Sequence, residues 1–176
     1  MKMDLVANSK NDEFYTPIYA ITPIEKYIKR NSVVYCPFDT EESLFVKYFN
    51  EKGHRVIAAH IINGQDFFET EIPKECDYII SNPPYSKKTE VLQKLFSQNK
   101  PFAMLVGVVG LFESQKRFEM FKNNDFEIMY FNKRISYFKD YEEQKPSLNP
   151  PFSSVYVCKG ILPQKIVFEE LKRSDK

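Results

Sequence analysis

The chain has 176 residues, of which 43% are hydrophobic and 28% are charged, and its formal net charge at pH 7 is +1. This size suits one domain with a single core, and the composition excludes a chain that is disordered beyond its ends. The near-zero charge excludes the strong basic excess of many nucleic-acid-binding proteins, although a local basic patch fits within a balanced total. Net charge therefore neither supports nor excludes DNA as a partner.

The three cysteines, Cys36, Cys76 and Cys158, have no CxxC spacing, and each lies in or beside an apolar run. This pattern favours buried free thiols in a reducing compartment over a disulfide or a metal site. No apolar run approaches the roughly 18 residues of a membrane span, and the first residues lack the hydrophobic segment of a signal peptide. We therefore expect a cytoplasmic protein with no membrane partner and no metal.

Apolar runs of four to eight residues alternate with helical patterns, which is typical of a parallel sheet covered by helices on both faces. The pattern predicts one α/β domain over 1–176. In chain order we expect a helix at 17–29, a strand at 33–36, a helix at 41–52, strands at 55–60 and 78–81, a helix at 89–98, a strand at 102–109, a helix at 113–123 and strands at 127–131 and 154–158. From Leu162 onward one short amphipathic helix is predicted.

The strand at 78–81 runs directly into the turn Asn82-Pro83-Pro84-Tyr85. Two consecutive prolines have no backbone N–H and hold φ at about −65°, and Pro83 moves Asn82 out of the α region. A stiff turn is therefore expected at the carboxyl end of a strand, where open α/β sheets bind their ligands.

The chemistry of this turn suits a planar amino group. Asn82 Oδ1 and the Pro83 carbonyl oxygen can both accept hydrogen bonds from an exocyclic –NH2, while the Tyr85 ring stacks on the attached ring. Two acceptors that pull the hydrogens out of the ring plane localise the nitrogen lone pair, which is otherwise delocalised into the ring. The turn predicts attack by an amino nitrogen on an electrophilic carbon.

In this context, Asn82-Pro83-Pro84-Tyr85 after the strand DYIIS resembles the Asn-Pro-Pro-Tyr motif of S-adenosylmethionine-dependent amino-methyltransferases, especially DNA adenine-N6 methyltransferases. The resemblance implies a Rossmann-like methyltransferase sheet, S-adenosylmethionine as cofactor and DNA as substrate. It also implies that Asn82, Pro83, Pro84 and Tyr85 are the catalytic residues. A Pro-rich turn without catalysis is the alternative.

Near the start, Phe14, Tyr15, Thr16 and Pro17 resemble the family's Phe/Tyr-x-Thr-Pro element, which packs over the methionine end of the cofactor. The residues alone predict a helix start with Thr16 as N-cap and Pro17 at the first helical position. The N–H groups of that start could receive the cofactor carboxylate. A helix cap with no ligand is the alternative.

After the first strand, Pro37, Phe38 and Phe45 resemble parts of the family's Pro-Phe-x-Gly-Gly-Gly-x-x-Phe cofactor loop, and Asp39 lies within it. Residues 40–42 are Thr, Glu and Glu where the family has glycines. Glycines lack a Cβ atom and let the backbone come close to a ligand, but residues 40–42 all carry one. The backbone of this loop therefore cannot approach a ligand in that way.

The family's ribose-binding acid after the second strand is missing, because that strand ends at His60. Asp39 or Glu42 is the candidate substitute, and His60 is interpreted as an ordinary polar strand end. Further on, Asp66 and Phe67 resemble the family's Asp-Phe/Leu element, whose acid meets the adenine amino group of the cofactor while the ring lies against the base. A helix cap is the alternative for Asp66.

The least regular segment, 132–153, has a length that favours a functional loop on the substrate side. Within it, Lys133 and Arg134 stand beside Tyr137 and Phe138, a combination that suits phosphate contact and base stacking. A solvated loop is the alternative.

Phe152 resembles the family's late Phe, whose ring stacks on a flipped base from the side opposite Tyr85. It belongs to a second copy of the motif, Asn149-Pro150-Pro151-Phe152, which follows a loop and precedes a strand. We interpret that copy as a turn without catalysis.

The resemblance runs over about residues 13–158, so a separate target-recognition domain is not expected. Specificity for a target DNA sequence is then expected to come from residues 110–150 or from a dimer. Otherwise it is expected to be low. Small phage-encoded adenine methyltransferases look like this. The alternatives are an RNA adenine or protein glutamine methyltransferase, since a glutamine amide fits the same two acceptors, and a catalytically silent methyltransferase fold that acts as a binding protein.

Overall fold

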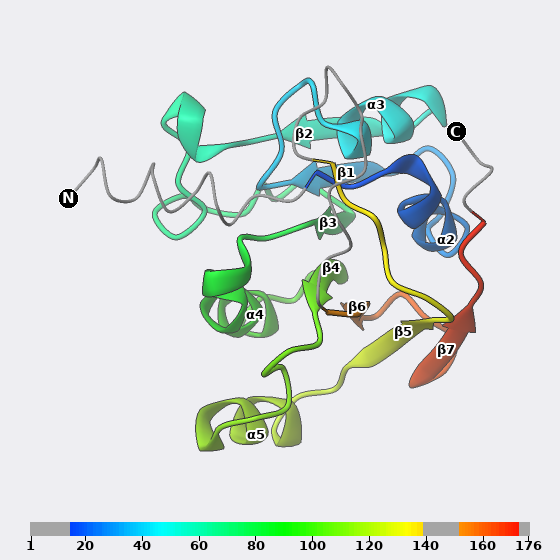
Figure 1. Ribbon diagram of the computed structural model, residues 1–176. Helices are drawn as coiled ribbons and strands as arrows, with labels where there is room; N and C mark the ends of the chain where they lie inside the picture. The colour runs from blue at the N-terminus through cyan, green and yellow to red at the C-terminus, as the bar shows by residue number, and fades with distance from the viewer. Residues whose placement is uncertain (1–14, 139–151, 173–176) are drawn as a thin grey trace.

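The computed structural model describes residues 15–138 and 152–172. Within these residues the strands form one seven-stranded sheet with the order β2-β1-β3-β4-β6-β5-β7 (Figure 1). The strands are β1 (Val33–Cys36), β2 (Arg55–Ala58), β3 (Tyr78–Ser81), β4 (Phe102–Gly107), β5 (Glu127–Phe131), β6 (Ser154–Lys159) and β7 (Ile166–Glu169).

The sheet is mostly parallel. β6 runs antiparallel to both of its neighbours, β4 and β5, whereas the pairings β1–β2, β1–β3, β3–β4 and β5–β7 are parallel. Because β6 is antiparallel to both β4 and β5, these two strands run in the same direction. The prediction of an α/β, Rossmann-like and mostly parallel sheet is confirmed.

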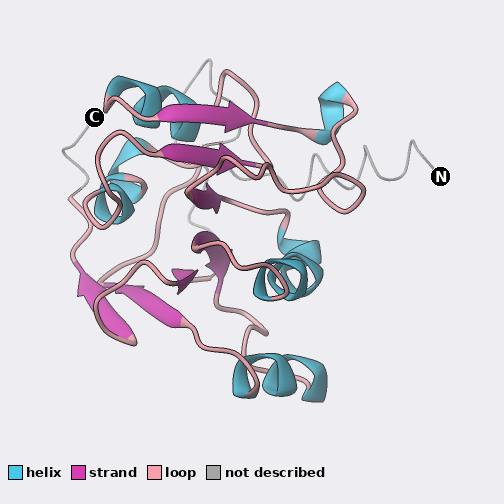
Figure 2. Cartoon of the chain, turned by 180° about the vertical axis from the view of Figure 1, so that it is seen from behind, coloured by secondary structure: helices cyan, strands magenta, loops and turns pink. Residues whose placement is uncertain are grey.

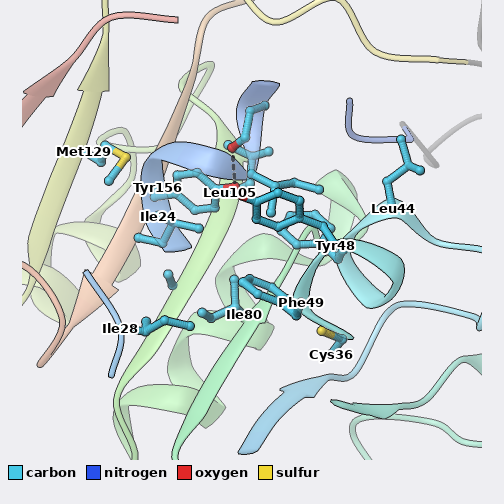
Figure 3. Close-up of a cluster of buried hydrophobic side chains, with 14 of the residues drawn as sticks. Ile24, Ile28, Cys36, Leu44, Tyr48, Phe49, Ile80, Leu105, Met129 and Tyr156 are labelled. Carbon is cyan, nitrogen blue, oxygen red and sulfur yellow. Dashed lines mark hydrogen bonds between the residues drawn. The ribbon is translucent and has the colours of Figure 1, made fainter. Parts of the chain in front are cut away.

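Helices cover both faces of the sheet, as predicted (Figures 1 and 2). Because successive strand residues point to opposite faces, Ile80 packs on one side with Ile24 and Phe49, whereas Ile79 packs on the other with Leu92. Figure 3 shows the first of these clusters. The helical elements are η1 (Ile18–Ala20), α2 (Thr22–Glu25), α3 (Leu44–Glu51), η2 (Ile61–Asn63), η3 (Tyr85–Lys87), α4 (Lys88–Phe96) and α5 (Gln115–Lys122).

The predicted helix at 17–29 is wrong in its extent. The chain forms the short 3₁₀ turn η1 and then the single-turn helix α2, with Pro23 in the first turn of α2. Because Pro23 has no N–H, it cannot donate the hydrogen bond that would join the two turns into one helix.

The helix predicted after Leu162 is also wrong, since residues 166–169 form strand β7, which pairs in parallel with β5. Ile166, Val167 and Phe168 are β-branched or aromatic residues, which favour a strand once a neighbouring strand is present. Pairing with a distant strand therefore prevails over the local amphipathic pattern.

The three cysteines are buried and free, as predicted. Burial raises the pKa of the Cys36 and Cys158 thiols well above the ordinary value. These thiols therefore stay protonated and act as small core side chains. Among the described residues, no helix has both the length and the apolar character needed to cross a membrane.

Candidate functional site

The sheet changes its winding direction between β1 and β3. The chain leaves β1 for β2 on one side and leaves β3 for β4 on the other, while β1 and β3 are direct neighbours. Ligands of open α/β sheets bind outside the carboxyl ends of the strands at such a point. The predicted turn Asn82–Tyr85 follows β3, and the predicted loop Pro37–Asp39 follows β1, so both lie at this position.

Asp39 is buried at the switch point and connects the two strand ends. Its Oδ2 accepts a hydrogen bond of 2.6 Å from Ser81 Oγ at the end of β3. Its Oδ1 accepts from Ser43 Oγ at 2.5 Å, and Ser43 is the N-cap of α3. The predicted cofactor residue Asp39 thus fixes the loop after β1, the start of α3 and the end of β3 relative to one another.

Thr16 and Asn82 lie in direct contact. Asn82 Nδ2 donates a hydrogen bond of 3.1 Å to Thr16 Oγ1, and the Thr16 side chain is buried. The predicted helix cap at Thr16 is wrong, because Pro17 occupies the N-cap position of η1 and no side-chain cap bond forms there. Thr16 instead orients the side-chain amide of the predicted catalytic residue through this hydrogen bond.

The segment around Thr16 is held by the chain that follows β5. The backbone N–H of Tyr15 donates to Phe138 O at 3.1 Å, and Phe138 N–H donates back to Tyr15 O at 2.9 Å. Ser136 N–H also donates to the hydroxyl of Tyr19 in η1 at 2.8 Å. Figure 1 shows this segment, in yellow, running from β5 toward β1. The described part of the predicted substrate-side loop therefore reaches the Thr16 element.

Three aromatic rings from distant parts of the sequence meet beside the turn. Tyr85 and Phe152 are in edge-to-face contact with centroids 5.2 Å apart, and Tyr137 lies 6.3 Å from Tyr85 and 6.5 Å from Phe152. Tyr137 is fully buried and its hydroxyl is 2.7 Å from Ser154 Oγ. Burial raises the pKa of the Tyr137 phenol well above its ordinary value, so the group is neutral.

The contact between Tyr85 and Phe152 brings together the two rings that were predicted to hold a base. A base stacked between two rings needs them parallel and about 7 Å apart. The Tyr85 and Phe152 rings are perpendicular, with centroids 5.2 Å apart, so no base fits between them in this arrangement. For the predicted stacking of a base between them, one ring would have to turn. Gly107 lies against the Phe152 ring, and a Cβ atom there would be 3.2 Å from Phe152 Cδ2.

A second aromatic contact lies beside the predicted cofactor loop after β1. The rings of Phe38 and Phe67 have centroids 5.0 Å apart, and Lys94 Nζ lies 4.5 Å from the centroid of the Phe67 ring. Phe67 is buried in the core whereas Phe38 is half-buried. Asp66 Oδ1 accepts a hydrogen bond of 2.9 Å from Phe68 N–H, so this carboxylate caps a local turn, and the helix of the alternative interpretation does not form there.

The loop after Asp39 is closed by its own hydrogen bonds. Ser43 N–H donates to Thr40 O at 3.0 Å, and Glu42 N–H donates to Thr40 Oγ1 at 3.3 Å. Two amides of this loop, those of Glu42 and Ser43, are therefore used within the loop.

The strand predicted over 55–60 ends earlier, at Ala58, and His60 lies two residues beyond it. His60 accepts from Ile62 N–H through Nδ1 and caps η2, so it is a helix cap and not a strand end.

The cations of the predicted substrate loop, Lys133 and Arg134, are exposed. Tyr137 and Phe138 are not exposed loop rings, since the first is buried and the second half-buried in the pairing with Tyr15. Phe14 and residues 139–151, which include most of the second Asn-Pro-Pro copy, lie outside the described residues.

Lys88 is a residue of this region that sequence reasoning missed. It is buried at the start of α4, and its Nζ donates to Gly107 O at 3.3 Å and to Val109 O. Burial lowers the pKa of its ammonium group. Lys88 fixes the carboxyl end of β4, against which Phe152 packs. Its position three residues after Tyr85 gives no local signal of this role.

The comparisons with known proteins are sparse. No family model and no curated protein matches the chain. A solved structure, the methyltransferase subunit of a type I restriction-modification system from Streptococcus thermophilus, aligns over 90% of this chain with 12% identity and a TM-score of 0.49. The chain spans 47% of that protein's length. At this level the likeness describes the course of the backbone and not the chemistry of a site.

Proposed function

We propose that the chain is an S-adenosylmethionine-dependent methyltransferase that acts on the N6 amino group of adenine in DNA. The observation that carries the proposal is the hydrogen bond between Asn82 and Thr16 at the switch point, 3.1 Å long. It joins the two motif elements in which the resemblance placed catalysis and cofactor binding. A plain Pro-rich turn has no need of this contact.

In the proposed reaction Asn82 holds the adenine amino group. Thr16 fixes the side-chain amide so that Oδ1 accepts one hydrogen of the amino group, and the Pro83 carbonyl oxygen accepts the other. The carbonyl of Pro84 has a different task, since it accepts from Lys87 N–H at 3.0 Å within the turn η3. The two acceptors localise the nitrogen lone pair and orient it for attack.

The three rings beside the turn give the base its stacking surface. Tyr85 follows the acceptors directly, and Phe152, two residues before β6, contacts it. A flipped adenine would replace the edge-to-face contact by stacking against one or both rings, which contributes about 1–3 kcal/mol per base. Lys133 and Arg134 are exposed on the loop that leads to this cluster and are suited to phosphate contacts.

The residues around the switch point fit S-adenosylmethionine in their chemistry. This cofactor has a positive sulfur, an ammonium group, ribose hydroxyls and an adenine amine, which all favour acceptor groups. Glu41 and Asp66 supply carboxylates, whereas the Glu42 carboxylate is already paired with Lys47 and the two Asp39 oxygens already accept from Ser43 and Ser81. The half-buried Phe38 ring offers an apolar surface for the adenine. When bound, the cofactor supplies a methyl carbon made electrophilic by the attached positive sulfur.

Tyr15, Thr16 and Pro17 would border the methionine end, with Pro37 beside Phe38 in the loop after β1. Pro37 is buried, so it shapes the loop and leaves the ligand contact to its neighbours. Phe67 is buried under Lys94 and would support the Phe38 ring rather than touch the adenine itself.

A catalytically silent binding protein is the second candidate, and one observation favours it. The loop at 40–43 uses the amides of Glu42 and Ser43 internally, so fewer backbone N–H groups are offered to a cofactor there than in a glycine loop. RNA adenine and protein glutamine remain alternative substrates for the catalytic reading, because both present an amino or amide group to the same acceptors.

Titration calorimetry with S-adenosylmethionine and S-adenosylhomocysteine tests the proposal, with and without DNA. Micromolar binding that weakens in Thr16→Val supports the catalytic function. Asn149→Ala, in the second copy of the motif, is the matched control for Asn82→Ala and should leave methyl transfer unchanged. No detectable heat at high concentration, also with DNA present, would reject the enzyme and favour the binding protein.

A further inference from the structure

Strand β7 forms one edge of the sheet, and its exposed side chains are apolar. Ile166 and Phe168 are 52% and 75% exposed, and Tyr130 on the neighbouring β5 is 54% exposed. The rings of Tyr130 and Phe168 contact each other with centroids 5.8 Å apart. At the opposite edge, the described residues of β2 include no exposed large hydrophobic side chain. An apolar edge strand without proline is open to pairing with another strand.

The backbone of β7 presents a defined set of hydrogen-bonding groups at this edge. The carbonyl oxygens of Lys165 and Glu169 accept from backbone N–H groups of Ile128 and Asn132, at 2.7 and 3.3 Å. In a parallel ladder, alternate residues of a strand face the same neighbour. The odd-numbered residues 165–169 therefore face β5, and the N–H and C=O groups of the even-numbered residues face away from it.

We propose that β7 pairs antiparallel with β7 of a second copy of this chain, with the two-fold axis at Val167. In this register Ile166 lies opposite Phe168 of the second copy, and the two residues exchange both backbone hydrogen bonds. Their side chains pack against each other on the exposed face. The same contact forms twice, as a closed two-fold interface requires.

The charges flanking Val167 fit this register. Lys165 and Glu169 stand at equal distances on either side of it, so each Lys165 lies opposite Glu169 of the second copy. Opposite charges across strands favour such a pair, and here Lys165 of the second copy would add to the ion pair that Glu169, 12% exposed, already forms with Lys26 of its own chain. The Glu169 carboxylate also accepts from Tyr27 Oη at 2.5 Å and from Lys26 Nζ at 2.7 Å. These bonds fix β7 to the α2 region, so the edge is ordered before it pairs.

Sedimentation velocity at protein concentrations from about 1 to 100 μM tests the pairing, since a dimer is populated according to mass action. Phe168→Glu should raise the dissociation constant at least tenfold. Phe168→Pro removes an outward N–H without removing a bond to β5, and it should weaken the dimer as well. Phe118→Glu changes an equally apolar side chain on α5, 58% exposed, and should leave the dimer intact.

The register has its own test, because Val167→Cys places two thiols across the axis at a separation that a disulfide can span. Under mild oxidation this variant should form a covalent dimer, whereas the wild-type chain with its buried cysteines should not. A monomer at every concentration would overturn the proposal, because β7 would then not pair with β7 of a second copy. A dimer that Phe168→Glu does not weaken would overturn it too, by placing the interface elsewhere.

Discussion

Asn82 donates a hydrogen bond to Thr16 across 3.1 Å, although the two residues are 66 positions apart in the chain. Thr16 is itself buried and lies next to Tyr15, which pairs with Phe138. Three segments from the start, the middle and the later part of the chain therefore determine the orientation of one amide.

Thr16→Val should lower kcat/KM for methyl transfer about 2- to 12-fold, because one neutral hydrogen bond contributes roughly 0.5–1.5 kcal/mol. Asn82→Ala should cost about 10²–10³-fold, since it removes an acceptor aimed at the reacting group. Steady-state kinetics of the single and double variants measure the coupling. The control is Thr22→Val, whose hydroxyl donates to Tyr19 O. Fully additive effects of Thr16→Val and Asn82→Ala would contradict the positioning role.

Asp39→Asn should destabilise the fold by about 1–3 kcal/mol, because an amide nitrogen cannot accept the hydrogen bonds that Ser43 and Ser81 donate. Urea denaturation measures the loss. Asp125→Asn, an exposed carboxylate on the loop before β5, is the matched control and should change stability little. If both variants unfold at the same urea concentration as the wild-type chain, Asp39 does not connect the strand ends as described.

Gly107→Ala should disturb the aromatic cluster more than the fold. The added Cβ would lie 3.2 Å from the Phe152 ring, which would have to move by a few tenths of an ångström. We expect a stability change within about 1 kcal/mol and weaker binding of an oligonucleotide that contains 2-aminopurine at the target base. Fluorescence of that base reports its unstacking. If the 2-aminopurine fluorescence and the oligonucleotide affinity are unchanged, Gly107 does not affect substrate binding.

Phe152→Ala distinguishes the substrates. A flipped adenine loses one stacking surface, so the binding free energy of DNA should weaken by roughly 1–3 kcal/mol. Activity on DNA should fall accordingly. A glutamine side chain has no ring to stack, so activity on a protein substrate should be spared. Parallel assays with DNA, RNA and a glutamine peptide measure the difference.

Much of the strand framework could be predicted because buried strands leave continuous apolar runs in the sequence. Ile79 and Ile80 show why, since both are buried, one on each face of the sheet. The turn at Asn82 could be placed at a strand end for the same reason.

The contacts that complete the candidate site were not predictable from local patterns. Thr16 has the local signature of a helix cap, and its bond to Asn82 exists because the fold brings β3 beside the first segment. Tyr137 has the sequence context of an exposed loop ring, yet it is buried beside Ser154. Such roles depend on long-range packing, which overrides local preference.

The most direct test of the proposed function is mass spectrometry of nucleosides from DNA incubated with the protein and S-adenosylmethionine carrying a deuterated methyl group. The proposal predicts N6-methyl-2′-deoxyadenosine that carries the deuterium label with the wild-type chain and with Asn149→Ala, and a loss of at least 100-fold with Asn82→Ala. Unlabelled adenine under conditions in which the protein binds both cofactor and DNA would contradict it.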